Sequence, residues 1–158
     1  MVEGTLKTVD QMLEEARGRL PGRPGPEDAY RLAGDGALLV DIRGDEQQRR
    51  DGLIPGALVI RRNVLEWRGD PASPWCDERL VQAGRDIILF CDEGYQSSLA
   101  AANLQMLGLN RATDMDGGFR SWKERDLPVV PYGSGTKRAM PSAMWRWFIR
   151  QITKGNSR

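Results

Sequence analysis

Short apolar runs alternate with segments of helical periodicity along this chain, and this alternation constrains the fold most. The clearest run covers residues 87–91, and it is bounded by turn-forming residues as a buried strand would be. Further strands are expected at residues 37–42, 57–60 and 112–115, and helices at residues 8–19, 27–33, 45–50, 97–107 and 119–125. Such alternation is typical of a parallel sheet that is flanked by helices on both faces. The sequence therefore predicts an α/β fold.

Proline, glycine and charge divide the chain into three parts. Thr8 and Gln11 fit a capping box at the start of the first helix, and the proline- and glycine-rich residues 21–26 break that helix. We therefore expect an N-terminal helix and linker over residues 1–25, a main domain over residues 26–132 and a basic tail over residues 133–158.

The tail combines a basic charge with an apolar helical face. Its charged side chains are all basic: Lys137, Arg138, Arg146, Arg150, Lys154 and Arg158. Within residues 142–154 the apolar residues share one face of a predicted helix. A basic amphipathic helix can lie on an anionic membrane surface or dock a protein partner. The alternative is that the tail packs on its own domain or on a dimer mate.

The composition excludes several classes of function. The chain contains no histidine, which removes Ser-His-Asp and Cys-His catalysis and histidine-containing zinc sites. Its two cysteines are too few for a four-thiolate metal site, so we expect no metal and no cofactor. A net charge of +1 gives no reason to expect nucleic acid as a partner.

The start of the chain and its hydropathy favour a cytoplasmic protein. No run approaches the roughly 18 apolar residues that a membrane-spanning helix needs. The first residues include an acid and do not form a basic signal sequence. We therefore expect both cysteines to be reduced.

Cys91 is the candidate nucleophile. It ends the clearest predicted strand and is followed by a short loop and a helix, and ligands of open α/β sheets bind at such strand ends. Backbone N–H groups of a loop that leads into a helix can stabilise a thiolate. The alternative is that Cys91 is a small buried residue at the end of a core strand.

The sequence resembles a single-domain rhodanese over about residues 26–131. The resemblance rests on four blocks in the family's order: residues 40–43 (Val-Asp-Ile-Arg), 52–57 (Gly-Leu-Ile-Pro-Gly-Ala), 88–98 (Ile-Leu-Phe-Cys-Asp-Glu-Gly-Tyr-Gln-Ser-Ser) and 117–122 (Gly-Gly-Phe-Arg-Ser-Trp). It implies a parallel sheet wrapped by helices, with an active-site loop after a central strand.

The resemblance also implies a function. Cys91 would accept a sulfane sulfur from a small-molecule or protein-persulfide donor, carry it as a persulfide, and pass it to a thiol or another nucleophilic acceptor. The cradle for that persulfide would be formed by Asp92, Glu93, Gly94, Tyr95 and Gln96, with Ser97 beginning the next helix. The alternative is a non-catalytic or regulatory module that keeps this fold and docks a partner through its tail.

The loop departs from the family's usual pattern. Gln96 stands where the loop of the family often carries an arginine, and Asp92 and Glu93 add acidic side chains. If these carboxylates line the mouth, they would repel thiosulfate. By the resemblance, Arg43 and Arg62 are the expected compensating cations in substrate binding, although each could instead be a structural arginine.

A related phosphatase class has an arginine six residues after its cysteine, and this position is Ser97 here. Without a guanidinium that clamps a phosphoryl group, phosphatase activity is not expected. The Ser97 hydroxyl is instead expected to cap the helix. Cys76 could resolve a Cys91 persulfide as a disulfide, and the simpler interpretation is an uninvolved loop cysteine.

Overall fold

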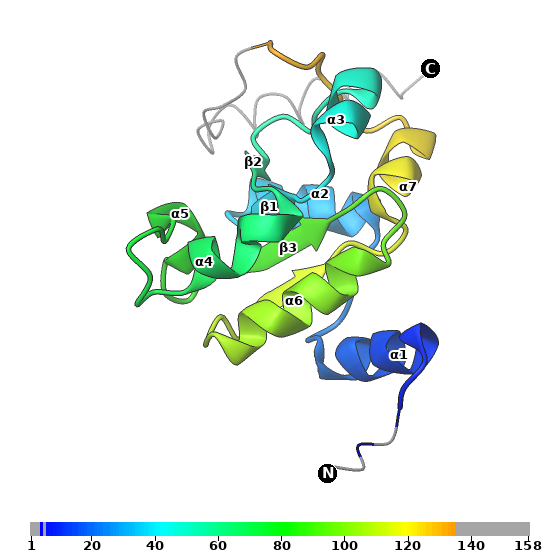
Figure 1. The fold of residues 1–158 in the computed structure, drawn as a ribbon. Coiled ribbons are helices and arrows are strands. Elements are labelled where there is room, and N and C mark those ends of the chain that lie inside the picture. Colours follow the sequence, from blue (N-terminus) through cyan, green and yellow to red (C-terminus); the bar gives the residue numbers. More distant parts are fainter. Residues whose placement is uncertain (1–3, 5, 135–158) are drawn as a thin grey trace.

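A parallel sheet forms the centre of the molecule. The computed structural model describes residue 4 and residues 6–134, and within them the sheet has four strands in the order β2-β1-β3-β4 (Figure 1). The strands are β1 (Leu38–Asp41), β2 (Leu58–Val59), β3 (Ile87–Phe90) and β4 (Ala112–Asp114), and all three pairings are parallel. The predicted α/β fold is confirmed, although each strand is shorter than its apolar run.

Helices cover both faces of this sheet. They are α1 (Val9–Arg19), α2 (Pro26–Gly34), α3 (Asp45–Asp51), α4 (Leu65–Gly69), α5 (Glu78–Val81), α6 (Gln96–Met106) and α7 (Gly118–Glu124), with a 3-10 turn at Arg62–Val64. None of the described helices is long and apolar enough to cross a bilayer.

Side chains of successive strand residues enter two separate cores. Ile87 and Leu89 pack with residues of α6 in one apolar cluster, whereas Ile88 and Phe90 pack with residues of α2 and α7 in the other. This alternation follows from the pleat of a strand, whose side chains point to opposite faces in turn. With both faces buried, a strand reads as a continuous apolar run, which explains the pattern at residues 87–91.

The register places Cys91 just beyond the carboxyl edge of the sheet. Asp41 pairs with Phe90 at the ends of β1 and β3, and the N–H of Ile42 donates to the carbonyl of Phe90 (3.0 Å). Cys91 is therefore the first residue past the last paired position of a central strand.

The N-terminal segment packs against the rest of the domain. The capping box is confirmed, since the Thr8 hydroxyl accepts from the N–H of Gln11 and the Gln11 side chain accepts from the N–H of Thr8. Helix α1 packs along α6 (Figure 1) and buries Ala16 and Leu20. The division of the chain at residues 25 and 132 stays a prediction, and the predicted tail helix at residues 142–154 lies outside the described residues.

Candidate active site

The thiol of Cys91 lies inside the loop that joins β3 to α6. Only 3% of the residue is exposed. Its Sγ accepts the N–H of Gly94 at 3.2 Å and lies 3.3 Å from the hydroxyl oxygen of Ser97. The loop thus turns back on itself so that a backbone N–H points at the sulfur.

The backbone of this loop has the form of an anion nest. Gly94 has a left-handed φ of +86°, whereas Tyr95 is right-handed with φ −100° and ψ −68°. Consecutive residues of opposite hand turn their successive N–H groups toward one side, where these groups can hold an anion. The N–H groups of Gly94, Tyr95 and Gln96 therefore form a cradle at the start of α6, next to Cys91.

Two glycines at the start of α7, Gly117 and Gly118, form the seat on which this loop rests. A Cβ atom at Gly118 would lie 2.6 Å from the carbonyl oxygen of Asp92, and one at Gly94 would lie 2.9 Å from the backbone nitrogen of Gly117. The N–H of Phe119 donates to the carbonyl of Cys91 (2.9 Å), and the N–H of Arg120 donates to that of Asp92 (3.0 Å). The predicted block at residues 117–122 therefore binds the loop directly.

Asp114, at the end of β4, is a buried acid behind the loop that the sequence analysis missed. Its carboxylate accepts hydrogen bonds from the hydroxyls of Ser97 (2.7 Å) and Ser98 (2.8 Å) and from Nε of Arg23 (2.7 Å). Burial lowers the pKa of Arg23, but the hydrogen bond and charge of Asp114 outweigh burial, so the net shift is upward.

The expected helix cap at Ser97 is wrong. Ser97 is the second residue of α6, and no side chain caps this helix. The Ser97 hydroxyl instead donates a hydrogen bond to the buried carboxylate of Asp114. Because Ser97 also lies beside Sγ, hydrogen bonds connect Cys91, Ser97 and Asp114 in one chain.

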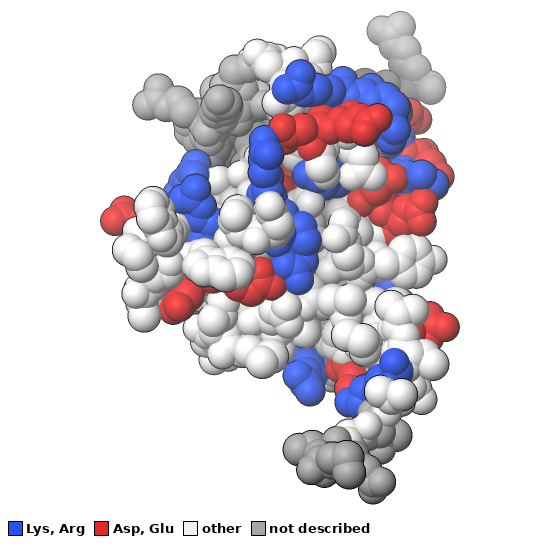
Figure 2. Space-filling model, viewed as in Figure 1, with Lys and Arg blue, Asp and Glu red and all other residues white. Residues whose placement is uncertain are grey.

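Arg120 neutralises the acidic side chains on the outer side of the loop. Its Nε lies 2.9 Å from an oxygen of Asp92, and its Nη1 lies 2.8 Å from one of Glu93. Figure 2 shows acidic and basic side chains interleaved on the surface over α3 and α7. Arg43 and Arg62 were the expected compensating cations, but Arg120 makes these contacts.

Arg43 lies in the interior rather than at the mouth of the loop. Its guanidinium donates to both carboxylate oxygens of Asp41 (3.0 and 2.7 Å) and to the carbonyl of Gly52 (2.8 Å), and it covers the ring of Phe119 at 3.7 Å. These contacts join the end of β1 to α7. The expected role of Arg43 in substrate binding does not fit a guanidinium that is fully buried and ion-paired.

Arg62 binds Glu66 at 2.8 Å, and Glu66 also accepts from the amide of Asn103 at 2.9 Å. Burial raises the pKa of Glu66, but the hydrogen bonds from Asn103 and Arg62 outweigh it and leave the pKa below its usual value. These contacts hold the 3-10 turn and α4 against α6. They do not involve the loop at residues 91–96.

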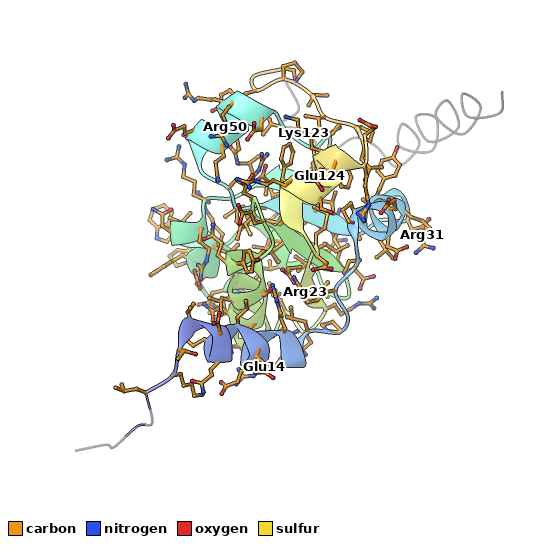
Figure 3. The ribbon with its side chains drawn as sticks, turned by 90° about the vertical axis from the view of Figure 1, so that its right-hand side faces the viewer. Glu14, Arg23, Arg31, Arg50, Lys123 and Glu124 are labelled. Carbon is orange, nitrogen blue, oxygen red and sulfur yellow. The ribbon has the colours of Figure 1, made fainter. Side chains whose placement is uncertain are left out.

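Two further arginines contact the loop from behind. Nη2 of Arg17 donates to the carbonyl of Gly94 (2.8 Å), and Nη2 of Arg23 donates to the same oxygen (3.2 Å). Figure 3 shows Arg23 between α1 and the body of the domain. The sequence gives no signal for either contact, since the partners lie 77 and 71 residues apart.

The second cysteine lies away from this loop. Cys76 is a free thiol in the connection between α4 and α5, which is on the opposite side of the molecule in Figure 1. Among the described residues, no three histidine, cysteine, aspartate or glutamate side chains are grouped so that they could hold a metal ion.

Comparison with known proteins places the chain in a family. Residues 25–125 match the Rhodanese-like domain. The chain belongs to the rhodanese-like family. A sulfurtransferase of Allochromatium vinosum is 30% identical over 93 residues, which cover 59% of this chain and 78% of that protein. The thiosulfate sulfurtransferase GlpE of Ectopseudomonas mendocina is 31% identical over 103 residues, which cover 64% of this chain and 84% of that protein.

Solved structures agree with this assignment. A Rhodopseudomonas palustris protein, described as of unknown function and a possible tyrosine phosphatase, has a TM-score of 0.73 at 31% identity, covering 82% of this chain and 99% of its own. The human single-domain sulfurtransferase TSTD1 has a TM-score of 0.50 at 30% identity, covering 66% of this chain and 98% of its own. The predicted resemblance to single-domain rhodaneses is confirmed.

Proposed function

We propose that this rhodanese-like protein is a sulfurtransferase that carries sulfur as a persulfide on Cys91. The observation that supports it most is the N–H of Gly94, which points at Sγ from a nest of backbone amides. A thiolate and a persulfide are both anions, and this arrangement offers each of them hydrogen-bond donors without a histidine. Curated relatives that are named sulfurtransferases support the same activity.

The reaction divides into two displacements at sulfur. The Cys91 thiolate uses an electron pair to form a bond to the sulfane sulfur of the donor, and the donor's leaving group departs with the electrons of the broken bond. The thiolate of an acceptor then attacks the outer sulfur of the persulfide, and the electron pair of the S–S bond returns to Cys91. No net oxidant or reductant is required, since the acceptor leaves as a persulfide.

Intact-mass spectrometry tests the proposal. Cys76→Ser leaves Cys91 as the only thiol, since the chain has two cysteines. Incubation with thiosulfate or with an organic persulfide is expected to add one sulfur atom, which cyanide or excess thiol then removes. Cys91→Ala is the matched control and should gain none. If the parent protein gains no sulfur from either donor, the fold serves a non-catalytic role and the proposal fails.

The description of the Rhodopseudomonas palustris protein raises phosphatase activity as a second candidate. Ser97 occupies the position where a Cys-x5-Arg loop has its arginine, and its hydroxyl binds Asp114. Arg17 and Arg23 bind the carbonyl of Gly94, so neither takes the place of that arginine among the amides of the nest. Hydrolysis of p-nitrophenyl phosphate should therefore stay at the rate of the buffer alone.

A further inference from the structure

We propose that Arg17 and Arg23, together called the arginine clamp, are positioning residues that orient the sulfur cradle from outside the matched family domain. The inference rests on the proposed function for the identity of the anion in the cradle. The geometry of the clamp itself depends only on contacts within the structure. Both residues precede residue 25, where the match to the Rhodanese-like domain begins.

The clamp fixes one carbonyl group. The Gly94 oxygen accepts two charge-assisted hydrogen bonds, from Arg17 at 2.8 Å and from Arg23 at 3.2 Å. Each arginine is itself held at another point. Nε of Arg17 donates to the hydroxyl of Ser98 (3.1 Å), and Nε of Arg23 donates to Asp114 (2.7 Å). The two guanidinium groups are therefore anchored on α6 and β4 while they hold the loop.

Fixing this oxygen also fixes the direction of the next N–H. A peptide unit is planar, and in its trans form the C=O and N–H bonds point in opposite directions. With the Gly94 oxygen on the clamp side, the N–H of Tyr95 points to the opposite side of the loop. Hydrogen bonds to the oxygen also polarise the peptide, which makes that N–H a stronger donor. The clamp thus orients and strengthens one amide of the nest.

Glycine at this position makes an external restraint necessary. Gly94 has φ of +86°, and a glycine can reach many other backbone conformations at little cost. Rotation of the peptide between Gly94 and Tyr95 would turn a carbonyl oxygen toward the sulfur, where it would repel an anion. This rotation would break the hydrogen bonds from both Arg17 and Arg23, and the clamp therefore opposes it.

Arg23 has a second effect through Asp114. This carboxylate is fully buried, and the Ser97 hydroxyl connects it to Sγ of Cys91. An unpaired negative charge there would disfavour an anion on Cys91. The guanidinium of Arg23 lies against the carboxylate and balances that charge. Arg23 therefore acts on the cradle both through Gly94 and through Asp114.

Alkylation of Cys91 measures the clamp without any sulfur donor. In the Cys76→Ser background, the rate of reaction with iodoacetamide would be recorded from about pH 5 to pH 10, a range that spans cysteine titration. Arg17→Met is expected to slow alkylation at pH 7 by about tenfold and to move the midpoint of the profile to higher pH. Arg19→Met, an exposed position two residues away on α1, is the matched control and should leave the profile unchanged.

A double variant separates the two effects of Arg23. Arg23→Met leaves Asp114 buried without its counter-charge, so it should slow alkylation and also lower stability. Arg23→Met with Asp114→Asn removes both charges, and alkylation should remain at least threefold slower because the Gly94 carbonyl still lacks the hydrogen bond from Arg23. Full recovery in the double variant would mean that Arg23 acts only through charge balance, which would overturn its place in the clamp.

Persulfide formation then links the clamp to the proposed function. An Arg17→Met variant that has the wild-type thermal midpoint but takes up sulfur more slowly would support the inference. An unchanged alkylation profile in Arg17→Met would overturn it, whatever the protein does with sulfur. A parent protein that alkylates readily but gains no sulfur from any donor would refute the proposed function and leave the test of the clamp intact.

Discussion

The loop at residues 91–96 is held by arginines on both of its sides, and the two sides differ in their access to water. Behind the loop, the side chain of Arg23 is 17% exposed and pairs with the fully buried Asp114. In front, the side chain of Arg120 is 61% exposed and pairs with Asp92 and Glu93. An exposed pair contributes little to stability, whereas breaking a buried pair leaves a charge without solvent. We therefore expect the contacts of Arg23 to fix the geometry of the loop, and the contacts of Arg120 to balance the charge of Asp92 and Glu93.

The largest loss of stability is expected when the close contact between Gly118 and the loop is disrupted, because the contacts on both sides of the loop are then displaced. Gly118→Ala places a Cβ 2.6 Å from the Asp92 carbonyl at a φ of +62°, and should lower the free energy of unfolding by about 3 kcal/mol. Gly108→Ala is the matched control, because Gly108 also has a positive φ but an added Cβ there meets no atom within 4 Å. Urea unfolding of both variants measures the difference, and equal losses would mean that the seat is not tight.

Removing one arginine from each side tests the comparison directly. Arg23→Met should cost about 3 kcal/mol of unfolding free energy because it strands the buried carboxylate of Asp114. Arg120→Met should cost less, about 1 kcal/mol, since Arg120 and Glu93 are exposed to water, although the side chain of Asp92 is only 11% exposed. Chemical unfolding at one pH and salt concentration compares the two. Similar losses for both variants would contradict the expectation that the contact of Arg23 stabilises the fold more than the contacts of Arg120.

Arg120→Met should instead change the rate of persulfide formation from charged sulfur donors. It leaves Asp92 and Glu93 without their counter-charge, so we expect persulfide formation from thiosulfate to slow about fivefold, or about 1 kcal/mol in the barrier. A neutral organic donor should be affected much less. The loss should shrink at high salt, which screens exposed charges. Arg125→Met, at the end of the same helix and paired with Glu27, is the control. A loss that salt does not change would argue against an electrostatic cause.

The smallest change in the free energy of unfolding is expected at Glu66. This residue contacts neither side of the loop, so it gives a baseline for the other variants. Because the folded state lowers the pKa of Glu66, its ion pair with Arg62 stabilises fully above the ordinary carboxyl pKa of about 4.3. That contribution is lost as the pH falls through the lowered folded value. Glu66→Gln should therefore cost about 0.5 kcal/mol at neutral pH, and the cost should fall as the pH drops below the ordinary carboxyl pKa of about 4.3. A cost that grows in acid would contradict this assignment.

Local sequence order predicted the fold and the position of Cys91 at the end of a central strand. The run at residues 87–91 is a strand because both of its faces are buried, and Cys91 follows directly because the chain turns there. The order of strand, loop and helix is a local property, so a single sequence shows it. The blocks at residues 52–57 and 117–122 were identified by their resemblance to the rhodanese family.

The partners of the charged residues could not be predicted in this way. The family resemblance placed Arg43 beside the loop, but Asp41 two residues earlier binds its guanidinium within the core. The Ser97 hydroxyl was expected to cap its own helix, but it donates a hydrogen bond to Asp114 at the end of β4. Nothing near Arg17 or Arg23 in the sequence indicates a contact with Gly94. Such choices depend on which distant groups the fold brings together.

The contact between Arg23 and Asp114 also has a consequence for when the site can form during synthesis. Its partners are 91 residues apart, so a long loop of chain must close before the carboxylate is balanced. Contacts of this separation slow folding, because the entropy of closure is lost before the contact compensates for it. Cys91 is translated before Asp114 and before the two glycines that seat its loop. A growing chain therefore carries the Cys91 thiol for some time before the residues that surround it in the folded domain have been synthesised.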